Sequence, residues 1–155
     1  MPGYELWGAE ERKELQDVLD NGILMRYGFD GPRKGIWKSR ELEKEISETF
    51  GCQFAQLVSS GTAALTTALS ALGIGYGDEV IMPAFTFVAS FEAVISVGAI
   101  PVLVDVDDTL TLSPEAVQKA ITGKTKCIMP VHMCGSMADM DALQEICKQH
   151  KLLLL

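Results

Sequence analysis

The sequence has 155 residues, 48% of them hydrophobic, and a formal net charge of −8. This length and apolar fraction are typical of a globular protein with a core, and they exclude a disordered or fibrous chain. The acidic balance argues against nucleic acid as the main partner, because a phosphate backbone binds to a surplus of Lys and Arg.

Neither a membrane span nor an export signal is predicted. No run of about 18 apolar residues is present, and the N-terminus MPGYELWGAEER lacks the basic and then apolar segments of a secretion signal. The four cysteines, Cys52, Cys127, Cys134 and Cys147, are irregularly spaced, which favours reduced core thiols over a disulfide framework. The run from Cys127 through His132 to Cys134 has no second ligand pair, so we predict no metal site. We expect a cytoplasmic protein without a membrane partner.

Residues 1–55 are predicted to form an N-terminal helical arm with two helices. The first covers residues 9–22, with acidic residues in its first turn and a glycine as its stop. The second is expected to begin at Ser39 as N-cap, and its apolar residues recur every four positions up to Phe50. This arm is also the expected region of substrate and dimer contacts.

The segment between these helices is locally basic in an acidic protein. Residues 25–40 contain Arg26, Arg33, Lys34, Lys38 and Arg40 against the single acid Asp30. An arginine matches a carboxylate with two parallel hydrogen bonds, so Arg26 and Arg33 are candidates to bind the carboxylate of a substrate. The alternative is a solvated loop, or an arm that contacts a second subunit.

From residue 56 onward, short apolar runs alternate with helical segments. The apolar runs cover residues 55–60, 79–85, 101–106, 127–133 and 151–155. This repeat predicts an α/β domain with a mainly parallel sheet and helices on both faces. We assign residues 56–155 to the first part of such a domain, and the buried strand at its C-terminus leads us to expect a truncated portion of a longer protein.

The turn SSGTAAL, residues 59–65, is a candidate anion site between a strand and a helix. Gly61 permits a close approach, and Thr62 and Ala63 can direct N–H groups and a hydroxyl at a ligand on the positive end of the helix. The alternative is that Ser59 or Ser60 only caps the helix. Neither of two other phosphate motifs, G-x-x-x-x-G-K-[ST] and a strand followed by G-x-G-x-x-G, occurs.

The next strand ends in PAFTFVAS, residues 83–90, and offers two aromatic rings. Phe85 and Phe87 lie two residues apart after Pro83, the expected strand exit. One ring can stack on an aromatic ligand, which contributes roughly 0.5–1.5 kcal/mol beyond area burial. The alternative is that both rings belong to the core.

These segments together resemble a known family, the DegT/DnrJ-type sugar aminotransferases. The resemblance extends from about residue 19 to the end, and GDEVI, P-x-x-T-F, GA-x-PV-x-VDV and VHM-x-G-x-MADMD occur in the family's order. Members have the large-domain fold of fold-type I enzymes and bind pyridoxal 5'-phosphate (PLP). The resemblance therefore implies that fold and that cofactor.

The resemblance also implies roles for individual residues. The positions that match the phosphate-binding turn are Gly61, Thr62 and Ala63. Phe87 matches the aromatic residue that stacks on the pyridine ring, which leaves Phe85 to pack inside. For His132, on the strand end near the site, we expect a structural role rather than acid–base chemistry.

Two further parts of the family's site have no match in this chain. The Asp that pairs with the pyridinium nitrogen and the Lys that binds the cofactor covalently are expected beyond Leu155, so no catalytic residue is assigned here. By this resemblance the chain alone is inactive. The complete enzyme is expected to be a homodimer that takes an amino group from a small donor, glutamate, and transfers it to a keto or aldehyde carbon of a sugar.

The basic stretch indicates which sugar. Its lengthened form resembles the branch of the family that makes 8-amino-3,8-dideoxy-octulosonate, a sugar acid of lipopolysaccharide. A nucleotide-linked 4-keto-sugar is the main rival substrate. The sequence is also compatible with a dehydratase that has His in place of the Lys, with a non-catalytic binding or regulatory member of the same fold, and with an inert half-domain that has an exposed sheet edge.

Overall fold

The computed structural model describes residues 3–155, which form two compact units. The first extends to Leu57 and the second covers Val58–Leu155, so the boundary lies two residues beyond the one predicted from the sequence. Among these described residues, no helix is both long and apolar enough to cross a membrane.

The first unit is helical. It contains η1 (Tyr4–Leu6), α1 (Ala9–Asn21), α2 (Asp30–Arg33) and α3 (Lys38–Phe50). At the start of α1 the N–H of Gly8 donates to the Glu11 carboxylate at 2.7 Å, and at its end Gly22 adopts a φ of 69°. That left-handed conformation favours glycine, and the predicted stop of this helix is confirmed.

The start of α3 differs from the prediction. Its N-cap is Trp37 and not Ser39, because the Glu41 carboxylate accepts the Trp37 N–H at 3.0 Å and satisfies the first turn in place of a serine hydroxyl. The helix ends at Gly51, with φ 65°, as expected from the sequence.

The second unit is a layered α/β structure. In chain order its elements are α4 (Gly61–Ala71), β1 (Glu79–Pro83), α5 (Val88–Ser96), β2 (Ile100–Val104), α6 (Pro114–Ala120), β3 (Thr125–Ile128), η2 (Met133–Gly135), α7 (Met140–His150) and β4 (Leu153–Leu154). The four strands are parallel, in the order β2-β1-β3-β4. The predicted fold class is confirmed.

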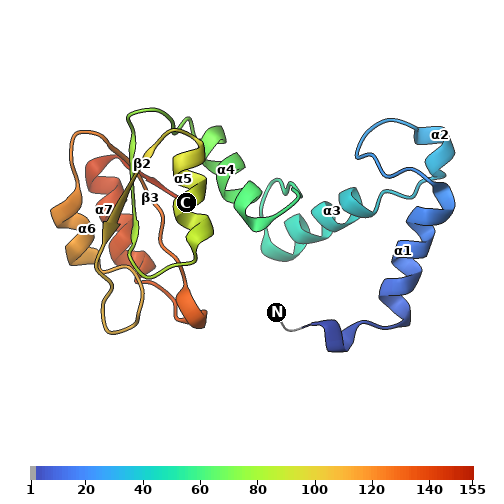
Figure 1. Cartoon of the computed structure of the whole chain (residues 1–155), viewed down its shortest axis with the longest axis horizontal. Coiled ribbons are helices and arrows are strands. Elements are labelled where there is room, and N and C mark those ends of the chain that lie inside the picture. The colour runs from blue at the N-terminus through green and yellow to red at the C-terminus, as the bar shows by residue number, and fades with distance from the viewer. Residues whose placement is uncertain (1–2) are drawn as a thin grey trace. The chain divides into compact units, whose positions relative to one another are not determined.

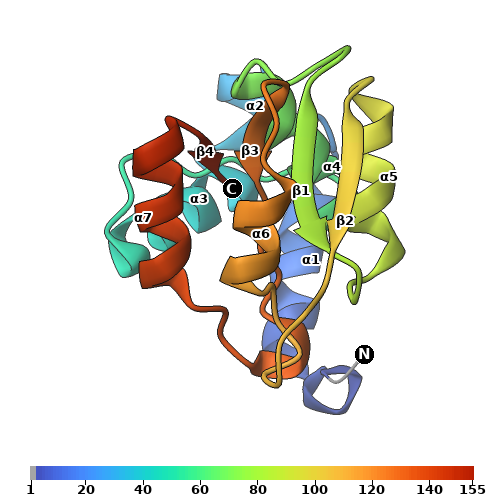
Figure 2. The same cartoon turned by 90° about the vertical axis from the view of Figure 1, so that its left-hand side faces the viewer.

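Helices cover both faces of this sheet, as Figures 1 and 2 show, with α4 and α5 on one side and α6 and α7 on the other. Along β1, Val80 and Met82 face the first pair of helices and Ile81 faces the second, and all three are fully buried. Burying one such side chain stabilises the fold by about 1.5–3 kcal/mol. The continuous apolar runs therefore reflect burial on both faces.

One predicted strand is absent from the described chain: residues 55–60 are irregular. The Leu57 N–H donates to the Glu43 carboxylate at 2.7 Å, and the Gln56 side-chain amide donates to the Leu57 carbonyl at 3.0 Å. Side chains thus take the hydrogen bonds that a neighbouring strand would have to supply. The apolar pattern was correct, but the expected strand was wrong.

The direction of the strands places the candidate site at one edge of the sheet. Because the strands are parallel, the loops that follow β1, β2 and β3 lie at the same edge, on the lower side of the α/β unit in Figures 1 and 2. Ligands bind beyond this edge in open α/β sheets. The first turn of α4 faces the same side, because the helix runs back toward the start of β1.

Candidate functional site

The first turn of α4 has both a cap and free N–H groups. The Ser60 hydroxyl accepts the Ala63 N–H at 3.1 Å, and the Ser60 carbonyl accepts the Ala64 N–H at 3.0 Å. The N–H groups of Gly61 and Thr62 precede these bonds, and neither donates to another group within residues 3–155. The cap interpretation is therefore correct for Ala63, while two N–H groups at the positive end of the helix stay available to an anion.

The space above this turn is open. Gly61 is exposed, and a Cβ placed on it would meet no heavy atom within 4 Å. A phosphate needs such an approach to the backbone, and the Thr62 side chain, which is half-buried beside it, carries a hydroxyl donor. The residues present here fit the phosphate of PLP.

The loop after β1 presents two aromatic side chains. Phe87, the extended N-cap residue of α5, is 70% exposed, which leaves its ring free to stack. The Thr86 and Ser90 hydroxyls lie 2.9 Å apart and fix the turn. Phe85 is 42% exposed, so the expectation that it packs inside is wrong: the loop leaves the sheet before this ring can reach the core.

His132, in the loop after β3, has a structural role. Its Nδ1 accepts the Ala138 N–H at 3.1 Å, so the neutral ring carries its proton on Nε2. This bond ties the loop to the residues that precede α7, in agreement with the expectation for this histidine.

The cysteines divide into two buried and two exposed thiols. Cys127 and Cys147 are buried, whereas Cys52 and Cys134 are exposed, and all four are free. Burial raises the pKa of the Cys127 thiol to about 12, and it also raises the pKa of Cys147. Nowhere in residues 3–155 do three His, Cys, Asp or Glu side chains lie close enough together to hold a metal ion.

The basic stretch surrounds a cavity of about 170 Å³ in the first unit. Its polar lining consists of Asn21, Arg26, Arg33, Lys38, Ser39 and Arg40, together with Trp37. Arg26 forms an ion pair with Glu43, with Nη2 2.7 Å from Oε1 and 2.8 Å from Oε2. The Arg26 guanidinium lowers the pKa of Glu43, and the N–H of Leu57 adds to this effect.

Arg33 is used to organise the loop. It is only 5% exposed, and its Nε donates to the Gly28 carbonyl at 2.9 Å while Nη2 donates to the Met25 carbonyl. Its guanidinium carbon also lies 4.2 Å from the centroid of the Trp37 ring. Two of the three side-chain nitrogens of this predicted substrate residue thus donate to the protein itself.

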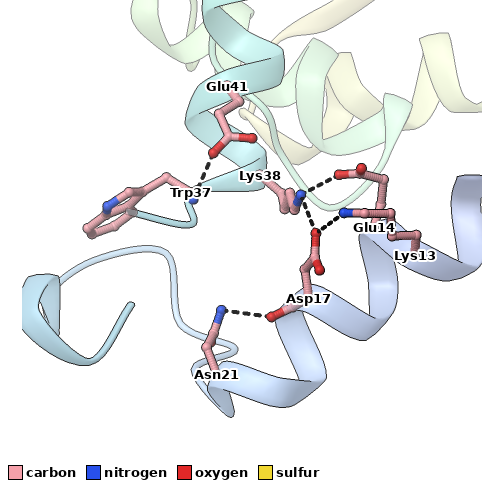
Figure 3. A network of polar contacts seen from close by, with 7 residues as sticks. All are labelled: Lys13, Glu14, Asp17, Asn21, Trp37, Lys38 and Glu41. Carbon is pink, nitrogen blue, oxygen red and sulfur yellow. Dashed lines mark hydrogen bonds and ion pairs between the residues drawn. The ribbon is translucent and has the colours of Figure 1, made fainter. Parts of the chain in front are cut away.

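Lys38 connects α3 to α1, as Figure 3 shows. Its Nζ pairs with Glu14 and, at 3.0 Å, with Asp17, which also accepts from Lys13 at 3.0 Å. These hydrogen bonds raise the pKa of Lys38 and lower the pKa of Asp17. The charge of Lys38 is therefore already balanced.

Trp37 also lines this cavity, and the sequence prediction did not single it out. The guanidinium carbon of Arg40 lies 3.7 Å from its ring centroid, so the indole contacts two arginines. Helical spacing does not join these three residues, because α2 ends at Arg33, Lys34 and Gly35 have positive φ, and Trp37 precedes α3. The sequence therefore had no local signal for this contact.

The sheet, its helices and the open edge define an α/β protein that matches fold-type I aminotransferase structures over part of their chains. Residues 6–155 match the DegT/DnrJ/EryC1/StrS aminotransferase family. The chain belongs to this family, which consists of PLP-dependent sugar aminotransferases and their relatives.

Three solved structures illustrate the likeness. A 3-amino-5-hydroxybenzoic acid synthase is 43% identical over 99% of this chain and 38% of its own, with a TM-score of 0.89. DesV of S. venezuelae, in complex with a ketimine intermediate, is 40% identical over 97% of this chain and 38% of its own, with a TM-score of 0.87. A GDP-4-keto-6-deoxymannose-3-dehydratase with a trapped PLP-glutamate geminal diamine is 28% identical over 96% of this chain and 38% of its own, with a TM-score of 0.81. The chain thus spans 38% of the length of each.

Proposed function

We propose that the protein carrying this sequence is a PLP-dependent aminotransferase that transfers an amino group to a keto or aldehyde carbon of a sugar. One observation carries the proposal beyond family membership. The first turn of α4 is open and has two free N–H groups, and the Phe87 ring is exposed at the start of α5, the helix that packs on the same face of the sheet. A phosphate cradle and an aromatic face at one edge suit a phosphorylated heterocycle.

The residues of this chain would bind and orient the cofactor. The N–H groups of Gly61 and Thr62, with the Thr62 hydroxyl, would hold its phosphate, and Ala63 would keep the turn closed through its bond to Ser60. Phe87 would lie against the pyridine ring. PLP, when bound, supplies the electron-withdrawing ring that stabilises negative charge on the reacting carbon.

We propose that the rest of the site comes from sequence that follows residue 155. The chain spans only 38% of the length of the relatives compared. The Asp that controls the pyridinium nitrogen and the Lys that binds the cofactor would lie in that part, and the complete enzyme would act as a cytoplasmic homodimer. The present chain would then bind the phosphate and the ring without catalysing transfer.

For the substrate we propose a sugar acid, with glutamate as the donor. The product would be 8-amino-3,8-dideoxy-octulosonate for lipopolysaccharide. The support is the basic cavity, which is lined by Arg26, Arg33, Lys38 and Arg40. A nucleotide-linked 4-keto-sugar is the second candidate.

The test uses the full-length protein. We expect it to show the visible absorbance of bound PLP, to lose that band on addition of glutamate, and to regain it with an octulosonate 8-aldehyde while an amine is formed. Replacing Thr62 by Val should weaken cofactor retention about tenfold or more, the effect of losing one hydrogen bond to a charged group. Thr67→Val, on the exposed side of the same helix, is the matched control.

Different outcomes identify the competing functions. A product that has lost water and gained no nitrogen indicates the dehydratase. A full-length protein that never takes up PLP, although it is folded, indicates the binding or regulatory member and contradicts the proposal.

A further inference from the structure

Four basic side chains line the cavity in the first unit, and three of them are already used by the protein. Arg26 and Lys38 are paired with carboxylates. Two of the three nitrogens of Arg33 donate to backbone carbonyls. The fourth side chain, Arg40, forms neither a hydrogen bond nor an ion pair within residues 3–155.

Arg40 is nevertheless held in place. Its guanidinium carbon lies 3.7 Å from the centroid of the Trp37 ring, and that of Arg33 lies 4.2 Å from the same centroid. Both guanidinium groups therefore contact the same indole. Arg33 thereby positions Trp37, and Trp37 supports Arg40. A planar group with all its donors unpaired is thus fixed before any ligand arrives.

The surroundings of Arg40 add further donors. The N–H groups of Lys38, Ser39 and Arg40 precede the first hydrogen bond of α3, from the Glu41 N–H to the Trp37 carbonyl at 2.9 Å. They form the positive end of that helix.

Arg33 contributes an independent sign of a ligand. The residue is only 5% exposed, and its third nitrogen, Nη1, donates to no acceptor within residues 3–155. Over the same residues, no buried side-chain nitrogen or oxygen lacks a partner. The Nη1 atom must therefore reach open space, and the open space that Arg33 lines is this cavity.

We infer that Arg40, fixed over Trp37, is the residue that binds a carboxylate of one of the two reactants; this rests on the proposed function. A carboxylate matches the two parallel N–H groups of an arginine. The cavity, about 170 Å³, holds such a group and a few waters at roughly 30 Å³ each. Of the pair favoured by the sequence, Arg33 is a positioning residue in this arrangement, and Arg26 is paired with Glu43.

Both reactants carry carboxylates, so the two half-reactions of the full-length enzyme are measured separately. Arg40→Gln is expected to raise the apparent KM about 10- to 100-fold for the reactant whose carboxylate is bound, with kcat nearly unchanged. If Arg40 binds the carboxylate of the sugar acid, the substitution should not raise the apparent KM for the methyl ester of that acid, which has no carboxylate to bind. If glutamate is bound, only the donor half-reaction weakens. Arg40→Lys should restore part of the affinity, because it keeps the charge and loses the planar fork.

The control is Arg12→Gln, which removes an exposed arginine of α1 that has no side-chain partner within residues 3–155. The inference would be overturned if Arg40→Gln left the apparent KM of both half-reactions unchanged. It would also be overturned if the variant raised the apparent KM equally for the sugar acid, its methyl ester and glutamate.

A second readout does not depend on activity. The sequence contains Trp7 and Trp37, and the difference in emission between the full-length protein and its Trp37→Phe variant isolates the signal of Trp37. Titration with 3-deoxy-octulosonate and with glutamate should shift this emission for one of them, and Arg40→Gln should abolish the shift. If neither compound shifts it, or if inorganic phosphate binds equally well, the carboxylate assignment is wrong. A shift in a protein that forms no amine would contradict the proposed function and leave the inference standing.

Discussion

Ser60 shows how one residue can serve stability and leave a ligand site open. Its hydroxyl accepts the third N–H group of α4, that of Ala63, at 3.1 Å. The N–H groups of Gly61 and Thr62 are then the ones that remain for an anion. Because the cap and the cradle use different donors, the two interpretations of this turn are compatible.

Replacing Ser60 by Ala should lower the free energy of unfolding by about 1 kcal/mol, the usual cost of losing an N-cap acceptor. Urea denaturation followed by circular dichroism measures this. The neighbouring Ser59→Ala is the matched control, since Ser59 is exposed and its hydroxyl forms no hydrogen bond within residues 3–155. Equal effects of the two substitutions would show that Ser60 does not cap the helix.

Phe87 is the second residue with a specific expectation. Phe87→Leu keeps an apolar side chain and removes the π face, so the dissociation constant of the full-length protein for pyridoxamine phosphate should rise roughly 2- to 10-fold, from a stacking contribution of about 0.5–1.5 kcal/mol. Cofactor fluorescence measures the change. Phe54→Leu, at a side chain that is 82% exposed in the first unit, serves as the comparison. An unaltered constant in Phe87→Leu would place the stacking elsewhere.

At the scale of elements, β3 and α7 each bury a thiol. Cys127 lies in β3 and Cys147 in α7, and both are shielded by apolar packing on one face of the sheet or the other. Burial disfavours the thiolate, which raises both pKa values. These elements therefore determine which cysteines can react.

In the folded chain at pH 8, a thiol reagent should modify Cys52 and Cys134 quickly and the two buried cysteines only after denaturation. Mass spectrometry of the modified protein identifies the sites. Rapid labelling of Cys127 without denaturant would mean that β3 opens on the timescale of the reaction.

The same burial predicts a pH dependence of stability. The folded pKa of Cys127, about 12, lies above its value of about 8.5 in the unfolded chain. The contribution of this thiol to the free energy of unfolding is complete below about pH 8.5. It is lost as the pH rises toward 12, because between these values the thiol ionises only in the unfolded chain. The free energy of unfolding should fall less steeply above pH 9 in Cys127→Ala than in the unaltered chain. Parallel pH profiles would contradict this origin.

At the scale of the whole molecule, the chain consists of two compact units that meet at Leu57 and Val58. Each unit has its own stabilising contacts. In the first, ion pairs between Lys38 and carboxylates of α1 join α3 to α1, and in the second, apolar side chains are buried on both faces of the sheet. The segment before the boundary has irregular backbone and exposed side chains, including Phe54.

Brief digestion with chymotrypsin should therefore cut first near Phe54, since proteases attack exposed and irregular backbone. The expected C-terminal product begins near the boundary and contains the whole sheet, as intact mass measurement will show. Phe54→Ala should slow the first cut. Initial cleavage within residues 79–155 would contradict the division into these units.

Much of the fold could be predicted from local pattern. The alternation of apolar runs and helical segments predicted a parallel sheet with helices on both faces, and the four parallel strands and their two cores confirm it. The strand at residues 55–60 and the Ser39 cap were wrong because both depend on which partner is available, and carboxylates of Glu43 and Glu41 took those hydrogen bonds.

By itself the sequence determined the order of elements, the family and the turn at Gly61, because glycine, caps and apolar periodicity act over a few neighbouring residues. Only the tertiary structure decided which of the four basic residues that line the cavity stays free. Whether a guanidinium is paired depends on acceptors that folding brings near it, such as Glu43 beside Arg26. These two residues are 17 positions apart in the sequence, so no local sequence pattern predicts their contact. Arg40 was one of several cations in the sequence, and the fold gives it an aromatic support but no hydrogen bond or ion pair within residues 3–155.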